Sequence, residues 1–243
     1  MKLSVIVPVF NERETILAVL EAVRAHPVDG VAYEVIVIDD GSRDGTGDLL
    51  EARPDLYAQL LRLPRNGGKG AAVKAGLRAA TGDYVLFQDA DLEYSPSDYP
   101  ALLRPVLEFG ADVVVGSRFL APRYTRVHYF WHLVGNRLLT LCFNLLFNAT
   151  FTDIYSCYLL YRRSRLDPER LRTQGWEQHA EILCSVTRPP AVIYEVPVGY
   201  SGRTYGEGKK IHARHAIPVF MMILRKRFES LFAGSAAGRG APR

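Results

Sequence analysis

The sequence predicts an α/β fold with a doubly wound, mainly parallel sheet, followed by amphipathic helices toward the C-terminus. Three observations predict it. Short runs rich in β-branched residues alternate with helix-length segments over the first 120 residues. These runs are apolar along their whole length, as in strands that helices cover on both faces. After residue 120 the alternation gives way to longer apolar segments with helical spacing.

The expected strands and helices alternate along the first half of the chain. We expect strands at residues 3–9, 33–38, 60–63, 84–87 and 113–115. The intervening helices are expected at residues 15–25, 44–52, 70–80 and 96–109. In such sheets ligands bind beyond the carboxyl ends of the strands. The residues that directly follow each strand are therefore the first candidates for a functional site.

The second half is expected to be mainly helical. An amphipathic helix, in one or two pieces, is predicted at residues 127–148, and one further strand at 192–200. Residues 201–210 are rich in glycine and basic residues and are typical of a mobile loop. A basic, apolar helix is predicted at 212–232, with a bend near Pro218.

The composition describes an ordinary globular protein and excludes several classes. The 243 residues are 48% hydrophobic and 23% charged, which excludes general disorder. Three cysteines, without a CxxC pair or a Cys/His cluster, indicate neither a disulfide framework nor a four-ligand zinc site. The apolar start ends at residue 11, so we expect no signal peptide. The longest apolar segments fall well short of the roughly 20 residues that span a bilayer.

The net charge of the chain does not indicate which kind of partner it binds. The chain carries 30 basic and 26 acidic residues, a formal net charge of +4. This mild excess is compatible with anionic lipid, with phosphorylated substrates and with nucleic acid.

The strongest chemical signal is QDADLE at residues 88–93, directly after an expected strand. Asp89 and Asp91 stand one residue apart where the chain leaves the sheet. Two carboxylates this close repel each other unless a cation lies between them, and Mg²⁺ or Mn²⁺ prefers such oxygen ligands. The alternative is an acidic turn that caps the helix beginning near Ser95. Spacing alone leaves both interpretations open.

Two further turns have the residue types of a nucleotide site. Asp39 and Asp40 end the second expected strand, where a carboxylate can accept hydrogen bonds from a ribose hydroxyl or a base, although these residues also favour plain turns. RNGGKGAA at 65–72 offers glycines for close backbone approach, Lys69 for a phosphate and a helix N-terminus. It lacks Walker spacing, and no GxGxxG follows the first strand.

In their order along the chain, these motifs resemble family 2 glycosyltransferases with a GT-A fold. The resemblance rests on VPVFNE (7–12), DDGSRDGT (39–46), RNGGKGAAVKAG (65–76), DADLE (89–93) and GSR (116–118). It is narrowed to the dolichyl-phosphate mannose or glucose synthase branch by NRLLT (136–140), FTDIYSCYLLYRR (151–163), GWEQHAEIL (175–183) and EVPVGYSGRTYGEGKKI (195–211).

The resemblance covers about residues 3–211 and implies a division of the chain. Residues 1–211 would form the catalytic domain, with a nucleotide-sugar half at 1–120 and an acceptor half at 121–211. The basic amphipathic helix at 212–232 would follow. The small and basic residues of the tail at 233–243 indicate disorder.

The resemblance also implies roles for individual residues. The donor would be bound by Pro8, Glu12, Asp39, Asp40, Lys69, Asp89, Ala90 and Asp91. Mg²⁺ or Mn²⁺ would be held by Asp89, Asp91 and Glu93. Catalysis would depend on Asp91, Arg203 and Lys209, the last two closing over the donor diphosphate. The acceptor phosphate would be received by Arg118, Arg137 and Thr140. Glu177 and Glu181 align with positions that are acidic in the family. The alternative interpretation is that both are structural residues of a helix.

The implied activity is inverting transfer of mannose or glucose from GDP-mannose or UDP-glucose to polyprenyl phosphate, such as dolichyl or undecaprenyl phosphate. The enzyme would be cytoplasmic and peripheral on the inner face of the membrane. Its amphipathic helices would dock on anionic lipid, with packing in the core or between copies as the alternative, so a homo-oligomer is left open.

Two other functions remain as alternatives. Transfer to a hydroxyl of a soluble molecule or glycan would need a general base, for which Asp153 and Glu177 are candidates. A non-catalytic nucleotide- or RNA-binding protein is the remote alternative. The intact Asp89 and Asp91 pair argues against it, and no nucleic-acid partner is expected.

Overall fold

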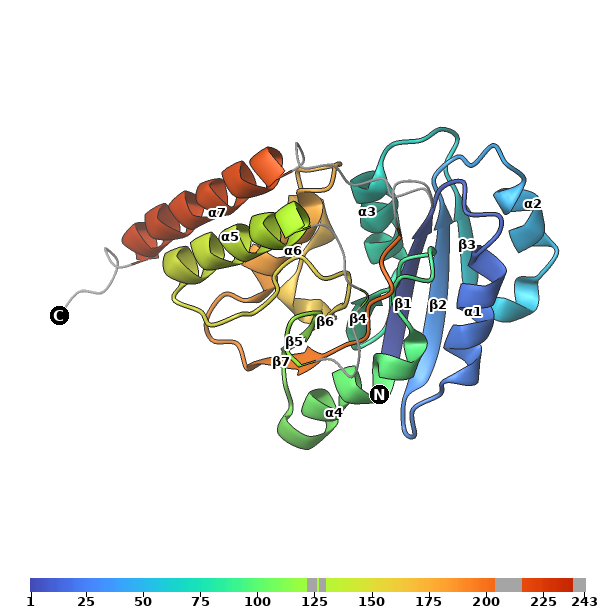
Figure 1. Ribbon diagram of the computed structural model, residues 1–243, viewed down its shortest axis with the longest axis horizontal. Helices are drawn as coiled ribbons and strands as arrows, with labels where there is room; N and C mark the ends of the chain where they lie inside the picture. Colours follow the sequence, from blue (N-terminus) through green and yellow to red (C-terminus); the bar gives the residue numbers. More distant parts are fainter. Residues whose placement is uncertain (122–125, 127–129, 204–215, 238–243) are drawn as a thin grey trace.

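A computed structural model describes residues 1–121, 126, 130–203 and 216–237, and these form one seven-stranded sheet surrounded by helices (Figure 1). The strands are β1 (Lys2–Val9), β2 (Ala32–Asp39), β3 (Gln59–Arg62), β4 (Tyr84–Phe87), β5 (Val113–Ser117), β6 (Leu159–Arg162) and β7 (Ile193–Pro197). Their order is β3-β2-β1-β4-β6-β5-β7. Among the described strands only β6 runs antiparallel to its neighbours, which confirms the predicted α/β fold with a mainly parallel sheet.

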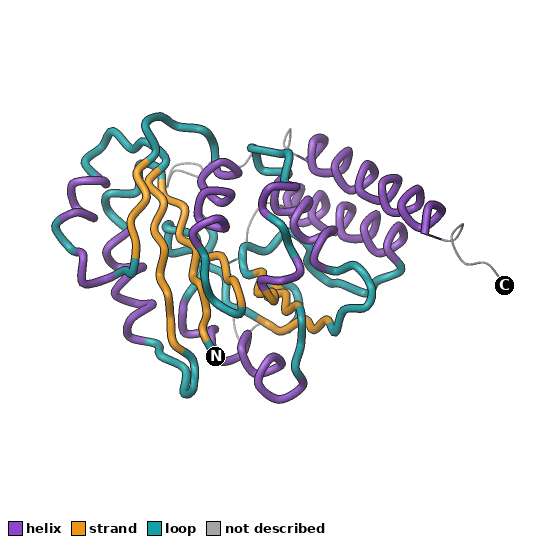
Figure 2. Tube along the Cα trace, turned by 180° about the vertical axis from the view of Figure 1, so that it is seen from behind, coloured by secondary structure: helices purple, strands orange, loops and turns teal. Residues whose placement is uncertain are grey.

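The helices follow the strands in the predicted alternation over the first half (Figure 2). They are α1 (Ile16–Ala25), α2 (Thr46–Glu51), α3 (Lys69–Ala79), α4 (Tyr99–Phe109), α5 (Phe130–Phe147), α6 (Gln178–Val186) and α7 (Ala216–Ala237). The fourth predicted helix begins with a 3₁₀ turn at Pro96–Asp98, before α4. Four such turns, labelled η1 to η4, connect the described elements.

The central strands are buried on both faces, as their apolar runs predict. Ile6 of β1 pairs with Ile36 on one side and Phe87 on the other, and Ile6 and Ile36 are fully buried. All four residues of β4 are buried as well. Because β1, β2 and β4 are parallel neighbours, their carboxyl ends lie together at one edge of the sheet, where the acidic and glycine-rich turns follow.

Strand β6 was not predicted. Its four residues, LLYR, are too short to show a period, and they insert antiparallel between β4 and β5, with Leu160 facing Leu86 and Val114. Strand β7 is shorter than the predicted 192–200, because its parallel partner β5 ends at Ser117, which pairs with Pro197.

The C-terminal helix extends further than predicted. Its described part runs from Ala216 and includes Pro218, and residues 212–215 of the predicted helix lie outside the described residues. The helix also continues to Ala237, so residues 233–237 of the predicted disordered tail are helical. The alanines in this stretch favour helix. Residues 238–243 lie outside the described part.

Helices α5 and α7 lie side by side at the end of the molecule remote from α1 and α2 (Figure 1). Helix α5 is one continuous helix, but only Thr140 and Phe143 of it are buried. Leu139, Leu146 and Phe147 pack against the core, whereas other apolar residues of α5 face outward, because the helix is apolar around most of its circumference. Large apolar residues that remain more than half exposed are Phe130, Trp131, Leu138, Leu141 and Leu145 on α5, and Ile217, Met221 and Phe228 on α7. None of the described helices is both long and apolar enough to cross a bilayer.

Candidate active site

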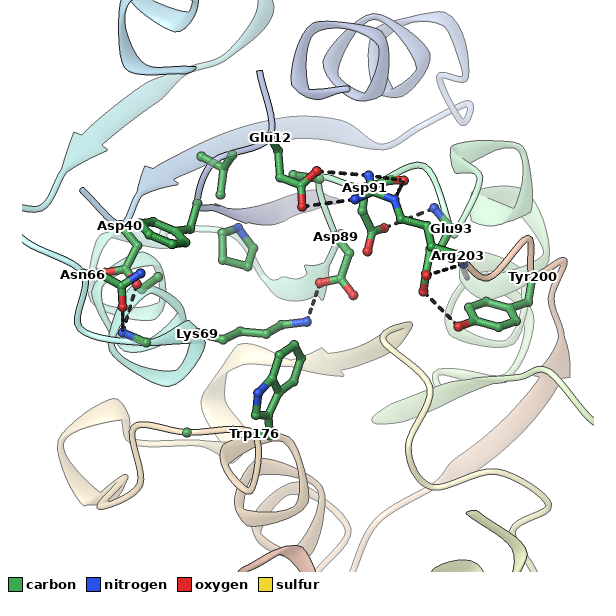
Figure 3. A pocket seen from close by; sticks show the side chains of 17 residues that line it. Glu12, Asp40, Asn66, Lys69, Asp89, Asp91, Glu93, Trp176, Tyr200 and Arg203 are labelled. Carbon is green, nitrogen blue, oxygen red and sulfur yellow. Dashed lines mark hydrogen bonds and ion pairs between the residues drawn. The ribbon is translucent and has the colours of Figure 1, made fainter. Parts of the chain in front are cut away.

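A cavity opens at the carboxyl ends of β1, β2 and β4 (Figure 3). Most of the residues that the sequence assigns to donor binding line it, namely Pro8, Glu12, Asp40, Lys69, Asp89, Ala90 and Asp91. Arg203 and Glu93 line it too. The structure therefore gathers in one place residues that are as much as 195 positions apart, as expected for the ligand edge of a parallel sheet.

Lys69 and Asp89 form an ion pair inside this cavity. Lys69 is the first residue of α3, and its Nζ lies 2.5 Å from Oδ1 of Asp89, which follows β4. Burial alone lowers the pKa of Lys69, but the charge of Asp89 raises it well above the ordinary value. Burial likewise opposes ionisation of Asp89, but Lys69 holds its pKa below the ordinary value. Both groups are charged at neutral pH.

Asp91 is the second carboxylate of the pair, and its environment disfavours its charge. Burial, together with the charges of Asp89 and Glu93, raises the pKa of Asp91 to about 7. The following residue, Leu92, has φ of 62°, a left-handed conformation that bends the chain directly after Asp91. Figure 3 shows both aspartates directed into the cavity.

These carboxylates fit a divalent cation. A positive ion between Asp89 and Asp91 would remove the repulsion that raises the pKa of Asp91. Within the described part of the chain no three His, Cys, Asp or Glu side chains converge as a complete metal cage. Two carboxylates with room for substrate phosphates and water are the ligand set that Mg²⁺ usually takes.

Arg203 enters the cavity from the chain that follows β7. Its Nη2 lies 3.0 Å from Oε2 of Glu12 and 2.7 Å from the carbonyl oxygen of Asp91. The carboxylate of Glu93 accepts hydrogen bonds from the backbone N–H of Arg203 at 2.6 Å and from the hydroxyl of Tyr200 at 2.8 Å. Both oxygens of Glu93 thus hold this segment, so its predicted metal role would require a change of partners. Lys209 lies outside the described residues.

The two aspartates after β2 have different surroundings. Asp40 lines the cavity, and its carboxylate accepts the N–H groups of Gly67 and Gly68 at 2.8 and 2.9 Å. Burial raises the pKa of Asp40 despite these hydrogen bonds. Asp39 does not line the cavity. It accepts the N–H of Ser42 at 2.9 Å and so shapes the turn, and donor contact by Asp39 stays a prediction.

The residues assigned to the acceptor do not line this cavity. Arg118 is buried and donates two hydrogen bonds to Asp153, from Nε at 2.7 Å and from Nη2 at 2.9 Å. Thr140 is also buried, and its hydroxyl accepts the N–H of Ile154 at 3.4 Å. Arg118 and Thr140 therefore contact the same short segment, whereas Arg137 is exposed on α5. An acceptor-phosphate role for these three residues stays a prediction.

The two candidates for a general base also lie outside the cavity lining. Asp153 is fully buried and ion-paired with Arg118, which holds the pKa of Asp153 below its ordinary value against the effect of burial. Glu177 is half-buried beside Gly175. Glu181 is buried and paired with Lys226, so here the structural interpretation is confirmed.

Sequence reasoning missed several residues of the cavity, among them Phe10, Asn66, Trp176 and Tyr200. The Trp176 ring lies 5.3 Å from Nζ of Lys69. The sequence carried a signal for each of these residues, because each lies within or directly beside a motif quoted for the resemblance. The spacing of residues along the chain, however, does not predict that Trp176 contacts Lys69.

Comparison with known proteins agrees with this geometry. The family model described as glycosyl transferase family 2 matches residues 4–167. Undecaprenyl-phosphate 4-deoxy-4-formamido-L-arabinose transferases of Yersinia pestis (strain Pestoides F) and Yersinia pseudotuberculosis (serotype O:3, strain YPIII) are each 38% identical over 117 residues. The match covers 46% of this chain and 36% of each relative, so it spans about a third of their length.

Solved structures share the fold. Glucosyl-3-phosphoglycerate synthase from Mycobacterium tuberculosis, in complex with Mn²⁺, UDP and phosphoglyceric acid, has a TM-score of 0.70 at 23% identity, covering 93% of this chain and 78% of that one. Its complex with Mg²⁺ and UDP has a TM-score of 0.67 at 25% identity, covering 93% and 79%. The family model covers well over half of the chain, from β1 to beyond β6. The chain therefore belongs to glycosyl transferase family 2.

Proposed function

We propose that the chain is an inverting hexosyltransferase that moves mannose or glucose from a nucleotide sugar to polyprenyl phosphate. The observation that carries the proposal is the charge arrangement of the cavity. Asp89 and Asp91 lie there with Lys69 and Arg203, and Glu12, Asp40 and Glu93 line the same cavity, so its described lining carries five carboxylates and two cations. The excess of carboxylates suits a nucleoside diphosphate that binds together with Mg²⁺ or Mn²⁺, and the two cations suit the further negative charge that the diphosphate gains as it leaves.

The donor would lie along the cavity. Its nucleoside would bind near Asp40 and Asn66, at the opposite end from Arg203 (Figure 3). Its diphosphate would lie beside Lys69 and the N-terminus of α3, where backbone N–H groups favour anions. The solved synthase structures, which hold UDP or UDP-glucose, support a nucleotide-sugar donor. GDP-mannose and UDP-glucose both remain candidates.

In the transfer, an acceptor oxygen would attack the anomeric carbon while the bond from that carbon to the diphosphate breaks. A bound Mg²⁺ or Mn²⁺ would supply positive charge at the leaving diphosphate. Lys69 would donate to the phosphate oxygens, since its raised pKa keeps it protonated. Arg203 would add a planar, permanently charged donor from the opposite side. These fixed donors would stabilise the charge that develops on the leaving group.

A phosphate acceptor fits a cavity that neither of the two general-base candidates, Asp153 and Glu177, lines. A phosphate monoester has a second pKa near 6 and is largely ionised at neutral pH, so it needs no dedicated general base. Of the two base candidates, Asp153 is engaged by Arg118, and Glu177 does not line the cavity. The undecaprenyl-phosphate transferases that match part of the chain support the same acceptor class.

The exposed apolar residues of α5 and α7 support a site of action at a lipid surface. Trp131, Leu138 and Leu145 on α5 are each more than half exposed, in a part of the fold that also carries Arg225 and Arg227 on α7. Apolar side chains beside basic ones are typical of helices that lie in the interface of an anionic bilayer. Contact between two copies of the chain is the alternative use of this surface.

A second candidate function is transfer to a hydroxyl of a phosphorylated small molecule. It is favoured by the structural similarity to synthase complexes that hold phosphoglyceric acid. A product assay separates the two functions. Membranes with radiolabelled GDP-mannose, UDP-glucose and UDP-GlcNAc should give label that extracts into organic solvent from one of the first two donors. Label that stays in the aqueous phase would favour the soluble acceptor.

A further inference from the structure

The C-terminal helix α7 has one side that faces outward and one that is buried. Ile217, Met221 and Phe228 are 69%, 58% and 57% exposed. Lys226 lies elsewhere on the same helix, and its side chain is only 9% exposed. Lysine is almost never buried without a partner. The burial of this one therefore indicates a specific contact rather than a solvated charge.

Lys226 pairs most closely with Glu181 on α6 and, at 3.7 Å, with Glu229 on its own helix. Nζ of Lys226 lies 3.0 Å from Oε1 of Glu181, whose side chain is 1% exposed. The same carboxylate accepts the backbone N–H groups of Arg172 and Thr173 at 3.1 and 3.0 Å, and the hydroxyl of Thr173 at 2.7 Å. One buried carboxylate thus joins α7 to the segment that precedes α6.

That segment continues into the wall of the cavity. The carbonyl of Gln174 accepts the N–H of Gly70 at 2.8 Å, and the side chain of Gln178 donates to the carbonyl of Gly70 at 2.6 Å. A Cβ at Gly70 would lie 2.4 Å from the carbonyl carbon of Gln174, so the two backbones are already in direct contact. Between these residues Trp176 lines the cavity, 5.3 Å from Nζ of Lys69.

We propose that the ion pair of Lys226 and Glu181 couples docking of α7 on a bilayer to the nucleotide affinity of the donor cavity. Lys226 and Glu181 are thus positioning residues. The link runs from α7 through the buried ion pair to residues 172–174, and from there to the turn that places Lys69. Neither Lys226 nor Glu181 lines the cavity, so both act through other residues. The inference rests on the proposed function, because it takes a nucleotide as the ligand and an anionic bilayer as the surface beneath α7.

The physical reason is the cost of an unbalanced buried charge. Without Lys226 the Glu181 carboxylate would lose its counter-charge in a buried position, which is strongly destabilising for that arrangement. The segment at 172–174 would move to let water reach the carboxylate. Because Gln174 and Gly70 are in backbone contact, that movement would displace the start of α3 and with it Lys69.

The two tryptophans of the chain allow the link and the docking to be measured separately. In a Trp131→Phe background, Trp176 in the cavity is the remaining tryptophan and reports nucleotide binding. UDP and GDP, each with Mn²⁺, are titrated with and without vesicles that contain phosphatidylglycerol. Lys226→Met is compared with Arg104→Met, a control that removes the same charge from a 73% exposed side chain on α4, outside both the cavity and the proposed lipid surface.

We expect Lys226→Met to weaken nucleotide binding about tenfold, as for coupled neighbours, and to abolish any tightening by vesicles. Arg104→Met should retain both the affinity and the response to vesicles, and Lys226→Arg should restore them. If Lys226→Met does not fold, Lys226→Gln replaces it with the same expectation.

Equal nucleotide affinity in Lys226→Met and Arg104→Met would overturn the inference and leave the proposed function intact. The inference would also be overturned if anionic vesicles left the nucleotide affinity of the control unchanged. Docking of α7 on a bilayer would then have no effect on the cavity. Failure of both UDP and GDP to bind would instead remove the proposed function, and the inference with it.

Discussion

Lys69 reaches from the first residue of α3 to Asp89 after β4, with Nζ 2.5 Å from Oδ1. This contact balances one carboxylate of the DADLE turn. The other carboxylate, Asp91, faces the negative charges of Asp89 and Glu93 in a buried position, and its pKa rises to about 7. The cavity is therefore arranged for one further positive charge beside Asp91, which an added cation would provide.

Asp91→Asn should stabilise the metal-free protein more at pH 8 than at pH 4. The pKa of Asp91 is about 7 in the folded protein and 3.8 as its ordinary value. The folded state then binds more protons than the unfolded state between these values, so the contribution of this group to stability falls as pH rises through that window. Asparagine cannot ionise and removes the effect.

Thermal unfolding at pH 4, 6 and 8 without metal checks this expectation. The difference in Tm between Asp91→Asn and the unaltered protein should grow with pH, and Mn²⁺ should raise the Tm of the unaltered protein more than that of the variant. A Tm difference that is the same at all three pH values would contradict a raised pKa of Asp91 in the folded protein.

Arg203 should make the segment at residues 201–210, predicted to be a mobile loop and described only to residue 203, responsive to the donor. Its guanidinium is held by Glu12 and the Asp91 carbonyl, and a diphosphate in the cavity would offer it a stronger partner. UDP with Mn²⁺ should slow proteolysis within the loop, and Arg203→Ala should remove this protection and lower donor kcat/KM about 100-fold. Arg104→Ala, at an exposed ion pair, is the control. Cleavage at equal rates with and without UDP would count against this role.

Arg118 and Arg137, the two arginines predicted to receive the acceptor phosphate, should respond differently to substitution. Arg118→Ala breaks a buried ion pair with Asp153 and should destabilise the protein by about 3 kcal/mol. Arg137 is exposed on α5, so Arg137→Ala should leave the Tm unchanged and raise the KM for polyprenyl phosphate at constant donor KM. Denaturant unfolding and initial rates check both. An unchanged lipid KM in Arg137→Ala would exclude this residue from acceptor binding.

Trp131 should report docking on lipid. Its side chain lies on an exposed part of α5, and residue exposure is 77%. In a Trp176→Phe background, its emission should shift to shorter wavelength with vesicles that contain phosphatidylglycerol, and less so at high salt, since exposed charges are screened. Leu141→Ser together with Leu145→Ser should weaken the shift without lowering the Tm. An unchanged spectrum, with sedimentation as a dimer, would assign the surface to a second copy.

The sequence predicted the sheet well where hydrophobic pattern decides the structure. The runs of β1, β2 and β4 are buried on both faces, so their residues carry the pattern without interruption. Strand β6 escaped prediction because four residues carry no period and its position depends on β4 and β5. The side of α5 that faces outward could not be predicted either. An almost uniformly apolar helix has no single apolar face that marks the side toward the core.

Much of the cavity lining was predictable because its residues follow strand ends. Glu12, Asp40 and Asp89 each lie within three residues of the end of a parallel strand, so topology alone brings them together. The contacts of Arg118 with Asp153 and of Trp176 with Lys69 join distant segments, and no spacing in the chain encodes them. Motif resemblance could name such residues, but only the folded chain shows which partner each one holds.

The central claim, transfer to the phosphate of a polyprenyl lipid, is tested most directly by a matched pair of acceptors. Purified protein receives radiolabelled GDP-mannose or UDP-glucose, Mn²⁺ and either undecaprenyl phosphate or undecaprenol, with Asp91→Ala as the inactive control. The account predicts label on the phosphate with one of these donors, none on the alcohol, and none with Asp91→Ala or excess EDTA. Label on undecaprenol or on 3-phosphoglycerate, with none on undecaprenyl phosphate, would contradict it.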